Sequence, residues 1–238
     1  MNKIYIPSAL TLIIGLLFTA APSFAPEFRG YAAGQLPVEI DRHAVQPAGY
    51  AFSIWGVIFL WLLASAAYGL WQRADHPVWV VTRPALIGAM LAGILWLFLA
   101  SSNPLLATVV IFAMAVFAIT AFLRADAGVD RWILSAPLAI FAGWVSAASL
   151  VSVGIMLGGY GLLPHPTAAL VMVAVLIAAA LFIQSRQPMM PVYGATVVWA
   201  IVAVAVVNRT EYPMVAIIAA GAALIMAAGT AWLRVKGR

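Results

Sequence analysis

The sequence predicts an all-α, polytopic transmembrane helix bundle of about eight spans, on the evidence of composition, the length of its apolar runs and the distribution of positive charge. Of its 238 residues, 66% are hydrophobic and only 8% are charged. Soluble domains carry about a quarter charged residues, because their surfaces must interact with water. Lipid is therefore the expected solvent for most of this chain.

Eight apolar runs are long enough to cross a bilayer. A span needs about 20 mainly apolar residues, and a backbone in lipid must satisfy its own hydrogen bonds, so each run should be an α-helix. The runs are separated by turn-forming sequences such as Asn103-Pro104 and Pro164-His165-Pro166. The last three runs also leave a seven-span arrangement open. The predicted spans are 4–22, 48–71, 82–102, 104–124, 132–157, 166–184, 190–208 and 213–233.

Positive charge is distributed unevenly between the two sets of loops. If the loops alternate between the two sides, one side collects nine of the twelve basic residues and the other only Arg29, Arg42 and Arg209. Lys and Arg are enriched in cytoplasmic loops, so both termini are expected in the cytoplasm. An even number of spans satisfies this expectation. The nine are Lys3, Arg73, Arg83, Arg124, Arg131, Arg186, Arg234, Lys236 and Arg238.

Tryptophans mark the same ends of the predicted spans. Trp71, Trp79, Trp132 and Trp232 fall there, and an amphipathic ring is stable at the level of the lipid headgroups. All four are therefore predicted to belong to an interfacial belt.

The first apolar run has two interpretations. Lys3, the apolar stretch and Ser23-Phe24-Ala25 resemble a signal peptide with its cleavage site. The run is also long enough to span, and Pro26 would follow the cut. Retention as a true span is favoured.

The predicted membrane interior lacks the groups that charge-driven chemistry needs. No Asp, Glu, Lys, Arg or His lies in the middle of a predicted span, and His43, His76 and His165 fall in loops. A charge at the bilayer centre costs roughly 2.5–3.5 kcal/mol, so it persists only where function requires it. This argues against proton pumps, voltage sensors, ion-coupled transporters, acid–base catalysis and axial ligation of haem. No cofactor is expected to be required.

The sequence also excludes cysteine chemistry and argues against nucleic acid as a partner. The chain has no cysteine, which removes thiolate catalysis and cysteine-ligated metals. Its net charge of +5 comes from residues at span ends, and no basic patch is interleaved with aromatics, so nucleic acid is not an expected partner.

Aromatic and small residues occupy the interior instead. Such a set can hold a flat ligand in an apolar pocket, or it can simply serve the packing of helices against one another. Both interpretations are open on this observation alone. Gly154 and Gly158 form a GxxxG pair that is expected to serve packing within the fold rather than dimerisation. The aromatic and small residues in question are Phe52, Trp55, Phe59, Trp96, Phe98, Trp144, Ala147, Ala148, Val151 and Ser152.

The segment 23–46 is unusually long for a connection between helices. It carries charged residues, among them Glu27, Arg29 and Arg42, together with His43, and it belongs to the side opposite the termini. Long loops of this kind are often lids over binding sites. An ordinary solvated loop is the alternative.

Three sequence blocks resemble the tryptophan-rich sensory protein (TspO/MBR, translocator protein) family. They are Pro47 to Phe59 followed by Tyr68-Gly69-Leu70-Trp71, then Leu95-Trp96-Leu97-Phe98, then Pro137 with the run Trp144 to Ser152. They fall in the order and the spans that the family has, after a long first loop. The resemblance covers residues 1–157, a five-helix core. Residues 158–238 look like the three-helix C-terminal extension of a longer bacterial subgroup.

The resemblance implies an outward-facing cavity among the first five helices, covered by the first long loop. It further implies a bacterial inner-membrane protein that binds a porphyrin or other tetrapyrrole, or a sterol-like molecule. The implied partners are this hydrophobic small molecule and the lipid bilayer, and a homodimer stays open. The ligand-binding residues carried over are Phe52, Trp55, Phe59, Trp96, Phe98, Trp144, Ala148 and Ser152.

The resemblance leaves three functions open. They are a sensor or receptor, a transporter of the same ligands, and an enzyme that degrades porphyrin in light, for which Trp96 and Trp144 would be the photochemical residues. The sequence favours binding, because it supplies neither a coupling-ion site nor conventional catalytic groups.

Overall fold

The computed structural model describes residues 5–26 and 34–237, and within them every secondary-structure element is a helix. The predicted all-α fold class is therefore confirmed. The elements are α1 (Tyr5–Ala20), η1 (Ala21–Ser23), η2 (Gly49–Ser53), α2 (Ile54–Gln72), α3 (Pro77–Leu99), α4 (Pro104–Arg124), α5 (Ser135–Gly159), α6 (His165–Arg186), α7 (Val192–Asn208) and α8 (Pro213–Lys236), where η denotes a 3-10 helix.

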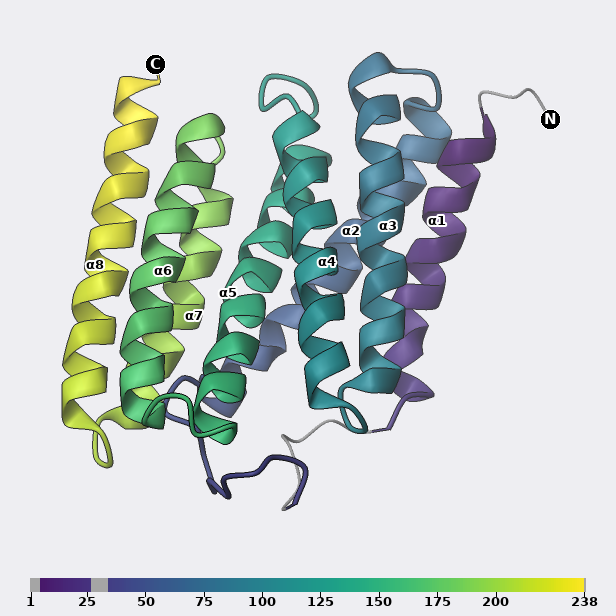
Figure 1. Cartoon of the computed structure of the whole chain (residues 1–238). Helices are drawn as coiled ribbons and strands as arrows, with labels where there is room; N and C mark the ends of the chain where they lie inside the picture. The colour runs from purple at the N-terminus through teal and green to yellow at the C-terminus, as the bar shows by residue number, and fades with distance from the viewer. Residues whose placement is uncertain (1–4, 27–33, 238) are drawn as a thin grey trace.

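The helices have the dimensions of membrane spans. Within the described residues, seven continuous helical segments are at least 18 residues long and apolar enough to cross a bilayer, the first of them formed by α1 together with η1 (Tyr5–Ser23). The helix α7 is apolar with 17 residues. At 1.5 Å per residue, α7 extends about 25 Å, at the lower end of what a span requires. In Figure 1 the eight helices run side by side, and the start of α1 lies at the same end of the bundle as the end of α8. The chain is thus an integral membrane protein whose helices alternate in direction.

The helices form two rings that share α5. In the first ring, α5 contacts α2 and α4, α4 contacts α3, and α1 closes the ring between α3 and α2. In the second, α5 contacts α6 and α7, and α8 closes the ring between them. Figure 1 shows α5 in the middle of the bundle, with α1 to α4 on one side and α6 to α8 on the other.

Small residues allow α5 to occupy this central position. Twenty of its 25 residues are buried. A Cβ added at Gly143 would lie 2.8 Å from the carbonyl oxygen of Tyr193 and 2.9 Å from Cβ of Thr196, so α5 and α7 touch backbone to backbone there. Lipid is as apolar as a leucine side chain, and helices in membranes associate through close packing rather than through the hydrophobic effect.

The GxxxG pair of α5 faces partners within the same chain. A Cβ at Gly154 would meet Val45 and Met172, and one at Gly158 would meet His43 and His165. The two glycines therefore admit the first long loop and α6 close to α5. The prediction that this pair serves packing within the fold is confirmed.

The start of α3 is a correction, and it makes Arg83 a buried charge near one end of the helix. α3 begins at Pro77, five residues before the predicted start at 82, so Arg83 lies in the second turn of the helix and is only 3% exposed. Its guanidinium donates to the carbonyl oxygens of Ala74 at 2.6 Å and Gly69 at 3.2 Å. The Gly69 carbonyl is one of those that the C-terminus of α2 leaves without a helical partner, and the Ala74 carbonyl lies in the turn that follows. Both bonds make the buried charge tolerable.

Trp79 is a second correction. It was predicted to lie at the headgroups, but it is 3% exposed, and its Nε1 donates to Oδ2 of Asp130 at 2.8 Å. Asp130 also pairs with Arg73 at 2.7 Å, and this hydrogen-bonded guanidinium lowers the pKa of the Asp130 carboxyl. The other three predicted belt residues, Trp71, Trp132 and Trp232, are exposed as expected.

Replacing Gly143 by alanine should loosen the bundle at the α5–α7 crossing. The added methyl group has no room against the Tyr193 carbonyl oxygen, and overpacking of this kind costs about 1–3 kcal/mol. Gly56 of α2 is the matched control, because a Cβ there meets nothing within 4 Å. Thermal unfolding in one detergent should give a lower midpoint for Gly143→Ala than for wild type, and an unchanged or higher one for Gly56→Ala. Equal midpoints for the two variants would contradict this account of the crossing.

Candidate ligand-binding site

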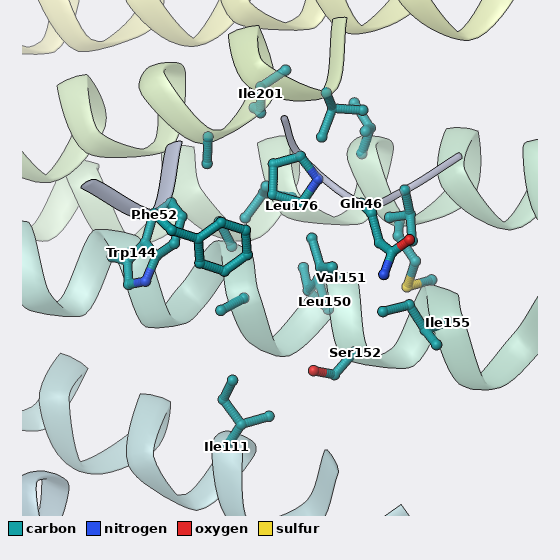
Figure 2. A pocket seen from close by; sticks show the side chains of 18 of the residues that line it. Gln46, Phe52, Ile111, Trp144, Leu150, Val151, Ser152, Ile155, Leu176 and Ile201 are labelled. Atoms are coloured by element: carbon teal, nitrogen blue, oxygen red, sulfur yellow. The ribbon is translucent and has the colours of Figure 1, made fainter. Parts of the chain in front are cut away.

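Two adjoining cavities lie inside the bundle. The first, here called the α5 cavity, has a volume of about 100 Å³ and is bounded by α2, α3, α4, α5, α6, α7 and the loop residues Val45 to Pro47. The second, called the α1 cavity, has a volume of about 250 Å³ and lies among α1, α2, α3 and α4. They share the side chains of Phe52, Trp55, Trp96 and Met114 as a common wall. Figure 2 shows the α5 cavity, with Phe52 and Trp144 side by side at one end.

Aromatic rings pack against one another along the common wall. The rings of Trp55 and Phe59 are stacked, with centroids 5.2 Å apart and an interplanar angle of 23°. Trp144 meets Phe52 and Trp55 edge to face, at 5.7 and 6.4 Å. Such pairs add to the stability that area burial provides, and they hold flat surfaces in defined orientations. The cluster therefore presents ring faces and edges in defined orientations to both cavities.

The structure brings together seven of the eight residues predicted to bind ligand. Phe59 lines the α1 cavity. Six line the α5 cavity: Phe52, Trp55, Trp96, Trp144, Ala148 and Ser152.

Phe98 is the exception among the eight, because it lines neither cavity and is 46% exposed. It follows Trp96 by two positions, which is about 200° around an α-helix, so the two side chains cannot share a face. Phe98 therefore faces outward, away from the predicted site.

Two phenylalanines of the aromatic cluster were missed. Phe18 of α1 contacts the rings of Trp55, Phe59 and Phe141, with centroids between 5.1 and 6.0 Å. Its ring fits because position 93 is glycine, where a Cβ would come within 2.4 Å of it. Phe141 lies one turn before Trp144 on α5, and this spacing could have predicted that the two rings share a face of the helix.

The C-terminal extension supplies a wall that the resemblance did not predict. The implied cavity was among the first five helices, but six residues of α6 and α7 also line the α5 cavity. Nothing in their sequence distinguishes them from lipid-facing residues. They are Met172, Val173, Leu176, Ala200, Ile201 and Val204.

Polar groups are few among the residues that line the α5 cavity. Gln46 and Ser152 are the only polar non-aromatic side chains there, and no lining residue is charged. The Oε1 atom of Gln46 accepts a hydrogen bond from the His43 backbone N–H at 3.0 Å, which leaves its amide NH2 group to donate. Within residues 5–26 and 34–237, no group of three or more His, Asp or Glu residues could hold a metal ion. The cavity can thus hold an apolar molecule with one or two polar substituents.

The described part of the first long loop, residues 34–48, is packed onto the bundle. The Val38 N–H donates to the Gly159 carbonyl at the end of α5 at 2.8 Å, and the Ala48 N–H donates to the Ala203 carbonyl of α7 at 3.1 Å. Between these two bonds, Ala44 and Val45 are buried. The described part of the loop therefore covers the α5 cavity, as the lid interpretation required. Glu27 and Arg29 lie outside the described residues.

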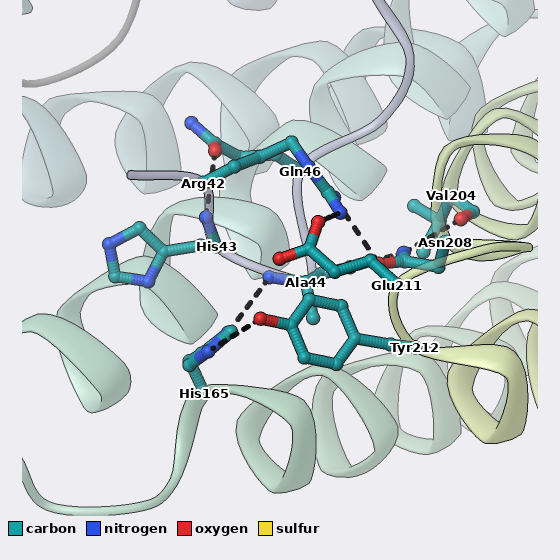
Figure 3. A network of polar contacts seen from close by, with 9 residues as sticks. All are labelled: Arg42, His43, Ala44, Gln46, His165, Val204, Asn208, Glu211 and Tyr212. Carbon is teal, nitrogen blue, oxygen red and sulfur yellow. Dashed lines mark hydrogen bonds and ion pairs between the residues drawn. The ribbon is translucent and has the colours of Figure 1, made fainter. Parts of the chain in front are cut away.

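A polar network fastens this loop to the second ring (Figure 3). The Asn208 amide at the end of α7 donates to the Ala44 carbonyl at 2.7 Å. Arg42 pairs with Glu211 at 2.5 Å, and its hydrogen-bonded guanidinium lowers the pKa of that carboxyl. The Ala44 N–H donates to Nδ1 of His165, the first residue of α6, at 3.2 Å. An Nδ1 that accepts must be unprotonated.

His43 is buried beside this network. It is 5% exposed, its Nδ1 lies 3.0 Å from a Cβ placed on Gly158, and its ring meets that of His165 edge to face at 6.1 Å. Burial, with a smaller contribution from the neighbouring His165, lowers the pKa of His43 to about 4. His43 is therefore neutral near pH 7.

Comparison with known proteins gives one match. A family model described as TSPO-like protein matches residues 6–232, nearly the whole chain. No curated protein and no solved structure matches. The matched range runs across the predicted boundary between residues 1–157 and 158–238, and that division stays a prediction.

Acidification should loosen the loop. The pKa of His43 is about 4 in the folded chain and about 6.5 in an unfolded one, so the stabilisation that its burial allows is complete above about pH 6.5 and is lost as the pH falls towards 4. The amides of Val38, Ala44 and Ala48 should then exchange faster with deuterium at pH 5 than at pH 7, after correction for intrinsic rates. The titratable group that faces His43 is His165. The charged or titratable groups that face His165 in turn are Tyr212, Glu211 and Arg42.

His43→Gln is the test variant, because it keeps a neutral polar side chain and removes the titration. Its loop should exchange with a weaker pH dependence than that of wild type. Amides in the middle of α4 serve as the internal reference. Loop exchange that is independent of pH in wild type would refute this role of His43.

Proposed function

We propose that this chain, which belongs to the TSPO-like protein family, is a membrane binding protein that takes up a flat hydrophobic ligand in the α5 and α1 cavities. The observation that carries the proposal is the common aromatic wall, in which Phe52, Trp55 and Trp96 line both cavities at once. Ring faces beside small residues such as Ala148 suit a flat, rigid molecule. Tetrapyrroles and sterol-like molecules, the ligand classes that the family resemblance implies, have this shape.

Uptake of such a ligand requires the two cavities to join. Each is smaller than the roughly 300–1,000 Å³ of typical small-molecule sites. Phe52 lies between them on the 3-10 turn that precedes α2, and its side chain is 47% exposed. It is therefore less constrained than a ring inside a helix. We propose that Phe52 turns aside when ligand enters.

The composition of the walls favours binding over catalysis. Among the described residues that line the two cavities there is no Asp, Glu, Lys, Arg or His. General acid–base catalysis therefore has no side chain to use there. Gln46 and Ser152 suit a hydroxyl or carbonyl group on the ligand, because both can hydrogen-bond to a neutral oxygen.

We also propose that both termini face the cytoplasm across a bacterial inner membrane. Of the described basic residues, only Arg42 and Arg209 belong to the end of the bundle opposite the termini. The other seven belong to the end where α1 starts and α8 stops, and positive residues are retained on the cytoplasmic side. These seven are Arg73, Arg83, Arg124, Arg131, Arg186, Arg234 and Lys236.

Titration of the detergent-purified protein with protoporphyrin, followed by tryptophan fluorescence, tests the proposal. Wild type should show saturable quenching. Trp144→Ala removes a ring face and Ala148→Leu fills the space beside it, so each should raise the Kd about tenfold, equivalent to about 1.4 kcal/mol. A sterol-like ligand measured by competition against protoporphyrin should show the same ranking of variants.

Matched controls separate loss of the site from general damage. Trp71→Ala removes an exposed tryptophan, and Ala228→Leu adds the same bulk on an exposed face of α8, and neither residue lines a cavity. Both should bind as wild type does. Unsaturable quenching in wild type, or equal effects of the site and control variants, would mean that the aromatic wall serves packing alone.

A further inference from the structure

A groove runs between α7 and α8 on the outside of the second ring. It has a volume of about 550 Å³, and its floor and sides are mostly alanine, valine and proline. Ala195, Ala227 and Ala231 along it are exposed, so it opens away from the bundle towards lipid. From Ala227 to Arg234 the groove follows two turns of α8, roughly 10 Å at 1.5 Å per residue. It thus begins at the end of the bundle that holds the termini and extends into the apolar layer.

Two polar side chains in this groove have hydrogen-bonding capacity that the chain does not meet. Arg234 is partly buried, and its Nε is buried without a partner. Thr230, one turn earlier on the same face of α8, is 7% exposed, and its Oγ1 also has no partner. The hydroxyl lies where the helices meet, within 2.1 Å of a Cβ placed on Gly194. A buried donor without a partner is costly, so the groove is set up for a ligand that accepts hydrogen bonds from Arg234.

Positive charge around the groove is not compensated by acidic residues. The ion pairs found in residues 5–26 and 34–237 are Arg42–Glu211 and Arg73–Asp130, and neither involves a basic residue of this end of the second ring. Arg186 lies over the Phe182 ring at 4.7 Å and Lys236 over the Trp232 ring at 4.2 Å, contacts that hold both cations near the membrane surface. Both belong to the same end of the second ring as Arg234, which is the one charged residue that lines the groove.

We propose that this groove binds one anionic phospholipid, with the phosphate at Arg234 and the upper part of one acyl chain between α7 and α8. Basic pockets between transmembrane helices on the cytoplasmic side recognise anionic headgroups, because the leaflet there is rich in them. An acyl chain matches the apolar walls of the groove. This site is separate from the two internal cavities and does not depend on what they bind.

A second groove on the same helix pair provides an internal comparison. It lies at the opposite end of α7 and α8 and also has small residues, such as Ala216 and Ala220, with Arg209 at its mouth. Arg209 is exposed, and it is not among the residues with a buried, unpartnered polar atom. The structure therefore assigns the anionic lipid to the Arg234 groove and not to the Arg209 groove.

The experiment measures retention of lipid by the purified full chain with native mass spectrometry. The protein is titrated with phosphatidylglycerol and with phosphatidylcholine of identical acyl chains. Wild type should retain one phosphatidylglycerol at concentrations at least five- to tenfold below those needed for phosphatidylcholine. Arg234→Gln should abolish this difference, and Ala231→Leu, which fills the groove, should weaken retention of phosphatidylglycerol while leaving all charges in place.

Two charge-matched controls and one competitor complete the design. Arg209→Gln and Arg124→Gln each remove one positive charge elsewhere, and both should keep the wild-type preference. Inorganic phosphate in millimolar excess should not displace the lipid, because it has no acyl chain. Equal retention of the two lipids by wild type would overturn the proposal. So would wild-type behaviour of both Arg234→Gln and Ala231→Leu, an equal loss in all three arginine variants, or displacement by phosphate.

Discussion

The close contact of α5 with helices on both of its faces is the constraint on which the rest of the structure depends. Lipid offers little hydrophobic drive for helices to associate, so the bundle needs surfaces that fit. α5 provides them with glycine, alanine and serine along nearly its whole length, and Gly143 brings it into backbone contact with α7. The two rings of helices can share α5 because its small side chains let helices approach it closely on both faces. Trp144 has the largest side chain of α5, and it lies where the aromatic wall and the α5 cavity meet.

Charged and polar residues concentrate at the ends of the bundle, and each end uses them differently. At the end opposite the termini, Arg42, Asn208 and Glu211 hold the first loop on the second ring. This loop in turn holds Gln46 at the cavity through the His43 backbone. At the other end, Arg83 satisfies the last carbonyls of α2, and Arg73 pairs with Asp130. The C-terminal helices therefore take part in the candidate site twice, as a wall of the cavity and as the anchor of its cover.

Apolar run length was enough to predict the helices, and the family resemblance supplied most of the residues that line the cavities of the first ring. Helical spacing placed Trp144, Ala148 and Ser152 on one face of α5, where they line one cavity, because positions four apart share a face. Other features depend on which helices become neighbours, and a single sequence does not contain that information. The role of α6 and α7 follows from their contact with α5, and the place of Phe18 follows from the absence of a side chain at Gly93. The start of α3 was predicted five residues too late, and the burial of Arg83 follows from the additional turn.

The central claim is that one ligand site is built by both rings. Photoaffinity labelling with a flat hydrophobic probe that carries a diazirine, followed by peptide mapping, tests it most directly. The account predicts adducts that excess unlabelled ligand prevents, on residues of α2 or α3 and also on α6 or α7 near Met172 and Ala200. Adducts confined to residues 1–157, or spread over lipid-facing side chains without competition, would contradict it.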